Sequence, residues 1–154
     1  MKRLLVYLFL SAFLISSGFA QTGPSKKQLN LDKSGLAIAG YDPVAYFSSG
    51  KAMEGKRELT AVEGGATYRF SNAANRELFK ANPAKYQPQY GGWCAYAMGA
   101  TGEQVSVDPE TFKILNGQLY LFYNKFFNNT LKDWNKSEQS LKKKADQNWS
   151  KFNH

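Results

Sequence analysis

Cysteine and histidine are nearly absent from the sequence, with one residue of each among 154. A single cysteine cannot form an internal disulfide, and it is too few for the zinc modules that bind their metal through several cysteines. The one histidine, His154, is the last residue of the sequence, and chain ends usually fray. We therefore expect neither a Ser-His-Asp catalytic triad nor a multi-histidine metal site.

Long apolar runs are missing as well. The longest, Leu4–Ile15, contains one serine and is too short to span a bilayer comfortably, which takes about 20 residues. Two basic residues precede this run and the small residues Gly18 and Ala20 follow it, a pattern typical of a secretory signal peptide. The sequence therefore predicts a signal peptide over 1–20, cleavage after Ala20, and a protein that is periplasmic or secreted. An uncleaved membrane anchor is the alternative, and no transmembrane segment is expected after cleavage.

The charge excess is of one sign, since 20 Lys and Arg residues against 12 Asp and Glu give a net charge of +8. Residues 31–124 nevertheless hold nine basic and nine acidic residues, so the excess belongs to the ends of the chain. No arginine follows Arg76, whereas a nucleic-acid binder is expected to show an arginine-containing basic surface. We therefore expect no nucleic-acid partner. The late lysines are interpreted as a solvated helix face, with weak attraction to an anionic surface as the lesser alternative.

The remaining composition predicts one folded domain. Hydrophobic residues make up 43% of the chain and aromatic residues 15%, which is enough for a core of this size. Residues 21–30 are polar and are predicted to form a flexible tether. Residues 31–154 are assigned to the domain.

Periodicity within this domain predicts a mixture of strands and helices. Ala66–Phe70 alternates in the manner of a strand, and Ser71 is expected to cap a helix over 72–81. Residues 129–152 keep apolar residues on one helical face and predict a single long helix. Further strands are expected at Gln104–Val107, Phe112–Leu115 and Leu119–Tyr123, with a turn at Asp108–Glu110 and a hairpin turn at Asn116-Gly117.

These elements predict an α+β fold class. A small antiparallel sheet would carry short helices packed on it, and the long amphipathic C-terminal helix would close the core.

Several short motifs occur in an order that a known family also shows. Gly40–Phe47 reads Gly-Tyr-Asp-Pro-Val-Ala-Tyr-Phe, and Pro88–Ala95 reads Pro-Gln-Tyr-Gly-Gly-Trp-Cys-Ala. The shorter ones are Tyr68–Ser71, Phe79, Pro83–Tyr86, Asp108-Pro109, Asn116–Leu121 and Ala145–Trp149. Together they resemble the YHS domain, in its exported single-domain bacterial branch, over residues 31–152.

The resemblance implies a small module similar to the TRASH group of metal-sensing or metal-handling domains. In those modules several cysteines bind a metal such as copper. This sequence departs from that pattern, because Cys94 is its only cysteine and Ser71 stands where some relatives have a second one. The multi-cysteine site is therefore not carried over.

Cys94 and Met98 are the first candidates for a site. Helical spacing would bring both sulfur atoms to one face, and soft sulfur ligands suit Cu(I). Three interpretations of Cys94 are open: a buried core residue, a ligand to a copper-like soft metal, and a redox or intermolecular thiol.

Asp42, Tyr41 and Tyr90 complete the candidate metal or ligand site. Asp42 precedes Pro43, so its carboxylate is expected to cap a short helix, with a carboxylate facing a cleft as the alternative. The tyrosines are candidates for a ligand pocket, with core packing as the alternative. The sequence contains no phosphate-binding glycine loop, no zinc spacing and no nucleophile elbow.

The function expected from the sequence is that of an exported, non-enzymatic YHS-domain protein. It would bind a soft metal such as copper, or a small ligand, near Cys94. The alternative is a structural or interaction module in which Cys94 is only a buried core residue.

Overall fold

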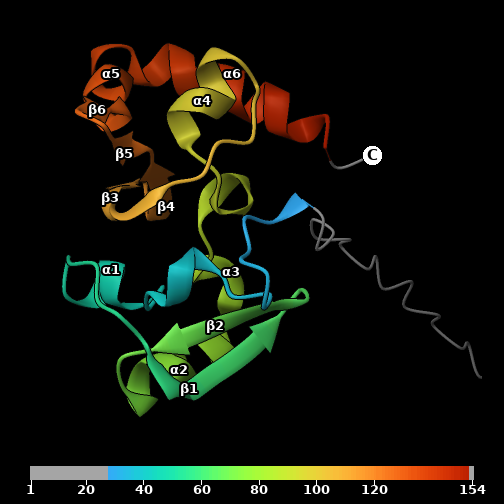
Figure 1. Cartoon of the computed structure of the whole chain (residues 1–154), viewed down its shortest axis with the longest axis vertical. Coiled ribbons are helices and arrows are strands. Elements are labelled where there is room, and N and C mark those ends of the chain that lie inside the picture. The colour runs from blue at the N-terminus through green and yellow to red at the C-terminus, as the bar shows by residue number, and fades with distance from the viewer. Residues whose placement is uncertain (1–27, 153–154) are drawn as a thin grey trace, which may run out of the picture.

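The computed structural model describes residues 28–152 of the chain (Figure 1). The predicted signal peptide and most of the predicted tether lie outside the described residues. The α+β fold class is confirmed, but in residues 28–152 three separate two-stranded antiparallel sheets replace the single small sheet that was expected. Within this described part, no helix is long and apolar enough to cross a membrane.

The elements lie in two groups, which we call the lower and upper halves after their places in Figure 1. The lower half contains η2 (Ile38–Gly40), α1 (Ala45–Ser48), β1 (Lys56–Glu63), β2 (Ala66–Phe70), α2 (Ala73–Ala81) and α3 (Pro83–Tyr86). The upper half contains η3 (Gln89–Gly92), α4 (Ala95–Ala100), β3 (Asp108–Leu115), β4 (Gln118–Phe122), β5 (Asn124–Lys125), β6 (Asn128–Asn129), α5 (Thr130–Lys136) and α6 (Glu138–Ser150).

Strand β4 joins the two halves because both of its faces are buried. Leu119 and Leu121 pack into the core of the lower half, whereas Tyr120 and Phe122 pack into the core of the upper half. Successive side chains of a strand point to opposite faces, so one short strand serves as a wall between two hydrophobic clusters.

Of the two strands in the β1–β2 hairpin of the lower half, the sequence predicted only β2. Ala66, Tyr68 and Phe70 of β2 are buried in alternation, which confirms that strand. Its partner β1 was not predicted. The side chains of β1 are mostly exposed, so its sequence lacks the apolar alternation that marks a half-buried strand.

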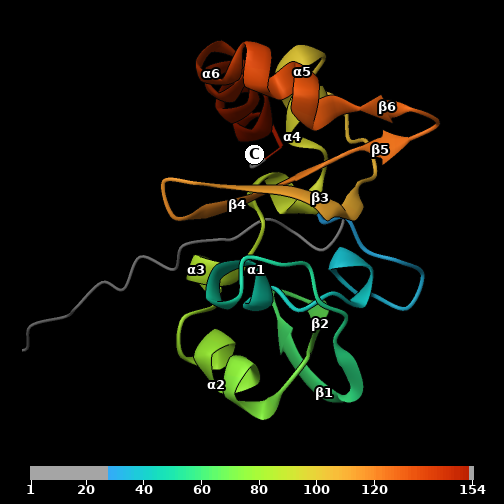
Figure 2. The same cartoon turned by 90° about the vertical axis from the view of Figure 1, so that its left-hand side faces the viewer.

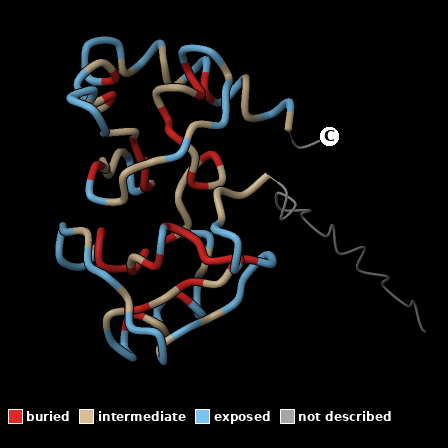
Figure 3. The backbone as a smooth tube through the Cα atoms, in the orientation of Figure 1, coloured by how far each residue is buried: buried red, intermediate tan, exposed pale blue. Residues whose placement is uncertain are grey.

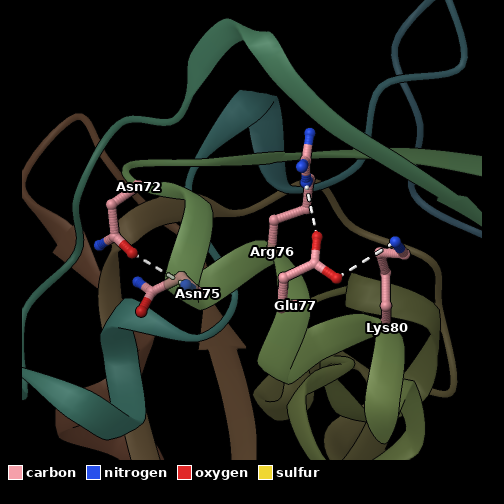
Figure 4. Close-up of polar contacts among 5 residues, drawn as sticks. All are labelled: Asn72, Asn75, Arg76, Glu77 and Lys80. Carbon is pink, nitrogen blue, oxygen red and sulfur yellow. Dashed lines mark hydrogen bonds and ion pairs between the residues drawn. The ribbon is translucent and has the colours of Figure 1, made fainter.

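Helix α2 is confirmed, but its predicted cap is wrong. The side chain of Asn72, not Ser71, accepts a hydrogen bond from the Asn75 amide at 2.8 Å (Figure 4). Ser71 instead donates its hydroxyl to Asp42. On the exposed side of the helix, Glu77 pairs with two cations of the same helix (Figure 4).

The β3–β4 hairpin turns at Asn116-Gly117, as predicted, and both residues have positive φ (51° and 73°). The predicted strand over Gln104–Val107 is wrong, because the Val105 carbonyl accepts from the Cys94 amide at 2.9 Å in place of a strand partner. The turn expected at Asp108–Glu110 is instead the start of β3, where the register with β4 is irregular.

The single helix predicted over residues 129–152 is also wrong. The chain leaves helical geometry at Ser137 (φ −145°, ψ 35°), which separates α5 from α6. This break allows Trp134 of α5 to be fully buried while α6 packs against α4. The packing is close enough that a Cβ atom on Gly99 would lie 2.5 Å from the Leu141 carbonyl oxygen.

Candidate functional site

Asp42 is completely buried, and both of its carboxylate oxygens are fully used. Oδ1 accepts from the amides of Val44 (2.9 Å) and Ala45 (3.3 Å), which confirms the predicted capping role. Oδ2 accepts from the Ser71 amide (2.8 Å), the Ser71 hydroxyl (2.6 Å) and the Asn75 side chain (2.7 Å). Five donors therefore surround the one carboxylate, which has about four lone-pair sites, and Asp42 links the start of α1 to the start of α2.

Tyr41 lies next to Asp42 but faces away from this cluster. Its hydroxyl donates to Glu110 Oε1 at 3.2 Å. Desolvation, and then the charge of Glu110, raise the pKa of the Tyr41 phenol. The Tyr41 hydroxyl therefore makes a hydrogen bond on the outside of the contact between α1 and β3.

Tyr90 is buried in the upper half, where it packs against Tyr120 and Trp149. Its hydroxyl donates to Asp146 Oδ1 at 2.8 Å. Burial, and then the hydrogen bond to this carboxylate, raise the pKa of Tyr90. The residue ties η3 to α6.

Cys94 is completely buried at the residue that precedes α4. Its Sγ accepts from the Tyr123 amide at 3.4 Å and lies 3.4 Å from the Thr130 hydroxyl. That hydroxyl has one proton and donates it to the Tyr123 carbonyl at 2.9 Å, so Cys94 is the donor in its contact with Thr130. The thiol thus bridges the residues on either side of the β5–β6 hairpin.

Met98 lies one helical turn after Cys94, with its amide donating to the Cys94 carbonyl at 3.0 Å. Its side chain is completely buried in the cluster that contains Phe122 and Trp134. It does not line the cavity beside Cys94 that is described next. The two sulfur-containing residues are therefore neighbours, but they face different surroundings.

A cavity of about 300 Å³ lies beside Cys94. Its wall is mostly apolar and is built from α4, the irregular segment after α4, and the base of the β5–β6 hairpin. Glu103 and Asn128 are exposed and stand at its open side. The lining residues are Cys94, Tyr96, Ala97, Ala100, Thr101, Glu103, Val105, Tyr123, Asn128 and Thr130.

A second cavity of about 260 Å³ lies between the two halves. Tyr90 and Trp149 line it from the upper half, and Tyr68 and Ala84 line it from the lower half. The structure thus divides the five sequence candidates among three places. Tyr41 and Asp42 lie in the lower half, Tyr90 lies at the second cavity, and Cys94 lies at the first, with Met98 in the core beside it.

Metal ligands are sparse around these places. Residues 28–152 contain no group of three or more His, Cys, Asp or Glu side chains that could hold a metal ion. Around the Cys94 cavity the ligand types present are one thiol, hydroxyls, one side-chain amide and the Glu103 carboxylate.

Sequence reasoning did not identify Tyr123 and Thr130 as the partners of Cys94. The helix predicted over residues 129–152 includes Thr130, and the short β5–β6 hairpin is absent from the predicted elements. The available signal was the polar Asn128-Asn129-Thr130 run, which can end a hairpin and cap a helix. Asn129 does cap α5, by accepting from the Leu131 amide at 3.1 Å.

Comparison of the chain with protein-family models, with curated proteins and with solved structures finds no match. The likeness to the YHS domain therefore remains a prediction from the sequence motifs.

Proposed function

We propose that the protein is an exported, non-enzymatic binding protein that takes a small, mostly apolar ligand into the Cys94 cavity. The observation that carries this proposal is the apolar cavity itself, whose lining residues include Cys94 and Thr130. Small-molecule sites are typically apolar hollows of about 300–1,000 Å³ with a few convergent polar groups. The cavity is at the small end of that range and fits a ligand of about one or two rings.

The apolar and the polar lining residues contribute to binding in different ways. Ala97, Ala100 and Val105 provide apolar contact, and burial of apolar surface supplies the affinity. Thr130 and Cys94 are already hydrogen-bonded to each other and to Tyr123. A polar contact from a ligand to Cys94 or Thr130 would have to compete with these existing hydrogen bonds, so it would add little to the affinity. These two residues would therefore affect the orientation of a bound ligand more than its affinity.

Indole is a suitable probe, because it has an apolar ring system and one N–H donor. We expect saturation-transfer NMR to detect indole binding to the wild-type protein. Ala97→Leu should fill the cavity and weaken that binding by about tenfold or more, since the added carbons occupy the ligand's volume. The control is Ala84→Leu, the same substitution in the second cavity, which should leave indole binding unchanged. Equal binding in both variants, or none in the wild type, would contradict the proposal.

A soft metal ion such as copper is the second candidate, supported by the Cys94 thiol on the cavity wall and by the resemblance to metal-handling modules. Its test is titration with Cu(I) in competition with a chelator. The metal hypothesis would replace the apolar-ligand hypothesis if Cu(I) binds stoichiometrically, if Cys94→Ser abolishes this binding, and if Ala97→Leu leaves it intact. Met98→Leu would then separate a one-sulfur from a two-sulfur site.

The third candidate is a structural or interaction module in which Cys94 is only packed. Its support is that the thiol is completely buried and hydrogen-bonded. A thiol reagent that labels Cys94 only after unfolding, together with no binding of indole or Cu(I), would establish it.

Export is tested separately, by sequencing the amino terminus of the protein from the periplasm or medium, where we expect Gln21.

A further inference from the structure

Two adjacent phenylalanines lie uncovered at the tip of the β5–β6 hairpin. Phe126 is 88% exposed and Phe127 is fully exposed, more than any other large hydrophobic residue in the described part of the chain. Figure 2 shows the hairpin projecting outward from the upper half, and Figure 3 shows its tip among the exposed stretches. Single exposed apolar residues are ordinary, but an adjacent aromatic pair at a projecting tip marks an interaction surface.

The backbone of this tip is unfavourable for the residues that form it. Asn124 pairs with Asn129 and Lys125 with Asn128, so the phenylalanines are the two central residues of the turn. Both have positive φ (53° and 64°), a conformation that bulky residues rarely adopt and that normally selects Asn-Gly in such a turn. The same chain uses that favoured pair in the β3–β4 hairpin. Local strain of this kind is retained where function requires it.

Hydrogen bonds at the base of the β5–β6 hairpin fix its position, so the tip has a defined place on the surface. The Thr130 amide and hydroxyl both donate to the Tyr123 carbonyl, at 3.0 and 2.9 Å. Cys94 Sγ accepts from the Tyr123 amide. The Asn124 side chain donates to the Thr111 hydroxyl at 2.9 Å, which fixes the hairpin to β3.

Exposed lysines lie on both sides of the tip in the sequence. Lys125 borders the phenylalanines, and Lys132 follows in the first turn of α5; both are exposed. Neither makes an ion pair with any described residue. The three acidic side chains after residue 124 are each held by a lysine: Asp133 by Lys136, Glu138 by Lys113 and Asp146 by Lys142. Beneath the hairpin, Glu103 at the open side of the Cys94 cavity accepts from Thr101.

We propose that the Phe126-Phe127 tip inserts into the interfacial region of a membrane that carries anionic lipids. Lys125 and Lys132 are placed to contact the lipid phosphates while the two rings enter the boundary between headgroups and acyl chains. Aromatic side chains favour this zone, and apolar burial with attraction of lysines to anionic lipid is the combination that holds peripheral proteins at membranes. The proposal does not depend on the Cys94 cavity being a ligand site.

A short hairpin tip suits this task. Unpaired backbone groups are costly inside a bilayer, and here only the turn itself would enter. The pairs below it remain hydrogen-bonded to each other. A pocket on a partner protein is the competing partner for the two rings. The exposed lysines on both sides of the tip in the sequence, Lys125 and Lys132, favour an anionic lipid surface instead.

The deciding variant is Phe126→Asn/Phe127→Gly. It removes both rings and installs the pair that this turn geometry favours, so the protein should unfold at the same or a higher temperature. The wild type should co-sediment with mixed phosphatidylcholine–phosphatidylglycerol vesicles, and the variant should bind about tenfold or more weakly. Val62→Ser is the matched control, since Val62 is 70% exposed on β1, and it should leave vesicle binding unchanged. All variants are made in the full chain, so that they share one amino terminus.

The charge requirement is tested with Lys125→Gln/Lys132→Gln. This variant should bind mixed vesicles more weakly than the wild type, and wild-type binding should fall with added salt. Three results would overturn the proposal: equal binding of wild type and Phe126→Asn/Phe127→Gly, equal binding to vesicles of phosphatidylcholine alone, or no wild-type binding at all. Loss of a co-purifying protein in the phenylalanine variant, with no lipid binding in the wild type, would assign the tip to a protein partner and would also overturn it.

Discussion

Asp42 and Cys94 are both completely buried, yet their surroundings differ in kind. The carboxylate of Asp42 accepts five hydrogen bonds from two neighbouring elements. The thiol of Cys94 makes two contacts of 3.4 Å and has a cavity beside it.

The difference follows from the chemistry of the two groups. A buried charge is stable only when its surroundings supply enough donors, so a buried aspartate requires a complete and rigid set of partners. A cysteine is a weak hydrogen-bonding group that packs as a small hydrophobic residue. It therefore tolerates a neighbouring empty space. In this protein the Asp42 carboxylate links the starts of α1 and α2, whereas the Cys94 thiol has few partners and lies beside a cavity.

The strongest way to break this comparison is Asp42→Ala. It leaves the amides of Val44 and Ser71 and the side chain of Asn75 without their acceptor, and we expect a loss of about 3 kcal/mol or more in the free energy of unfolding. Urea unfolding monitored by tryptophan fluorescence measures it. The matched control is Asp32→Ala, because Asp32 also accepts from two amides and a hydroxyl but is exposed. If Asp42→Ala lowers the free energy of unfolding no more than Asp32→Ala does, the hydrogen bonds of the buried Asp42 do not link α1 to α2 in a way that matters for stability.

Cys94→Ala should have a smaller effect, about 1.5 kcal/mol, because it removes one buried heavy atom and enlarges an existing cavity. The same unfolding measurement applies. A cost equal to that of Asp42→Ala would mean that the thiol contacts are as important to the fold as the carboxylate cluster. Our distinction between Asp42, which links two helices, and Cys94, which contributes less to the stability of the fold, would then be wrong.

The sequence predicted the parts of the fold that local patterns determine. Strand β2 follows from alternation, the β3–β4 turn from Asn116-Gly117, and the Asp42 cap from its position before Pro43. Each depends on neighbours within a few residues, so each is visible in a short window. Strand β1 and the break at Ser137 were not predicted, for the opposite reason. Strand β1 has little buried surface. At Ser137 the flanking apolar residues Trp134 and Leu141 are seven residues apart, which is also compatible with one face of a continuous helix.

The candidate site was less predictable than the fold. Cys94 was identified as a candidate, but its partners Tyr123 and Thr130 come from a part of the chain about 30 residues away. Pairing at that distance depends on where α4 and the hairpin pack, which no local pattern reports. Helical spacing predicted one shared face for Cys94 and Met98. The Met98 amide does bond to the Cys94 carbonyl, but Cys94 precedes α4 with non-helical backbone angles, and the two side chains face different surroundings. Spacing alone could not reveal that Cys94 lies beside a cavity whereas Met98 packs in the core.

Thr130→Val sharpens the comparison on the side of the thiol. The substitution keeps the shape of the side chain and removes the hydroxyl that donates to Tyr123 and accepts from Cys94, so we expect a loss of about 1 kcal/mol. Urea unfolding measures the change, and Thr101→Val, which removes an exposed hydroxyl on the other side of the same cavity, is the control. If the two variants cost the same, the contacts at the base of the hairpin contribute nothing specific.

The smallest expected effect concerns Glu138, a charged group with partners from other elements that is only partly buried. The hydrogen bond from Lys113 is the main cause that lowers the pKa of Glu138 from 4.5, and burial opposes it. A carboxyl group whose pKa is lower in the folded state stabilises the protein above its unfolded pKa, and this contribution is lost as the pH falls through the folded value. Glu138→Gln should therefore cost about 0.5 kcal/mol at neutral pH and almost nothing in strong acid. Unfolding curves for wild type and variant should converge below pH 4.5. A constant difference at all pH values would mean that Glu138 acts through packing and its bond to Trp134, which a glutamine side chain can only partly replace, and not through its charge.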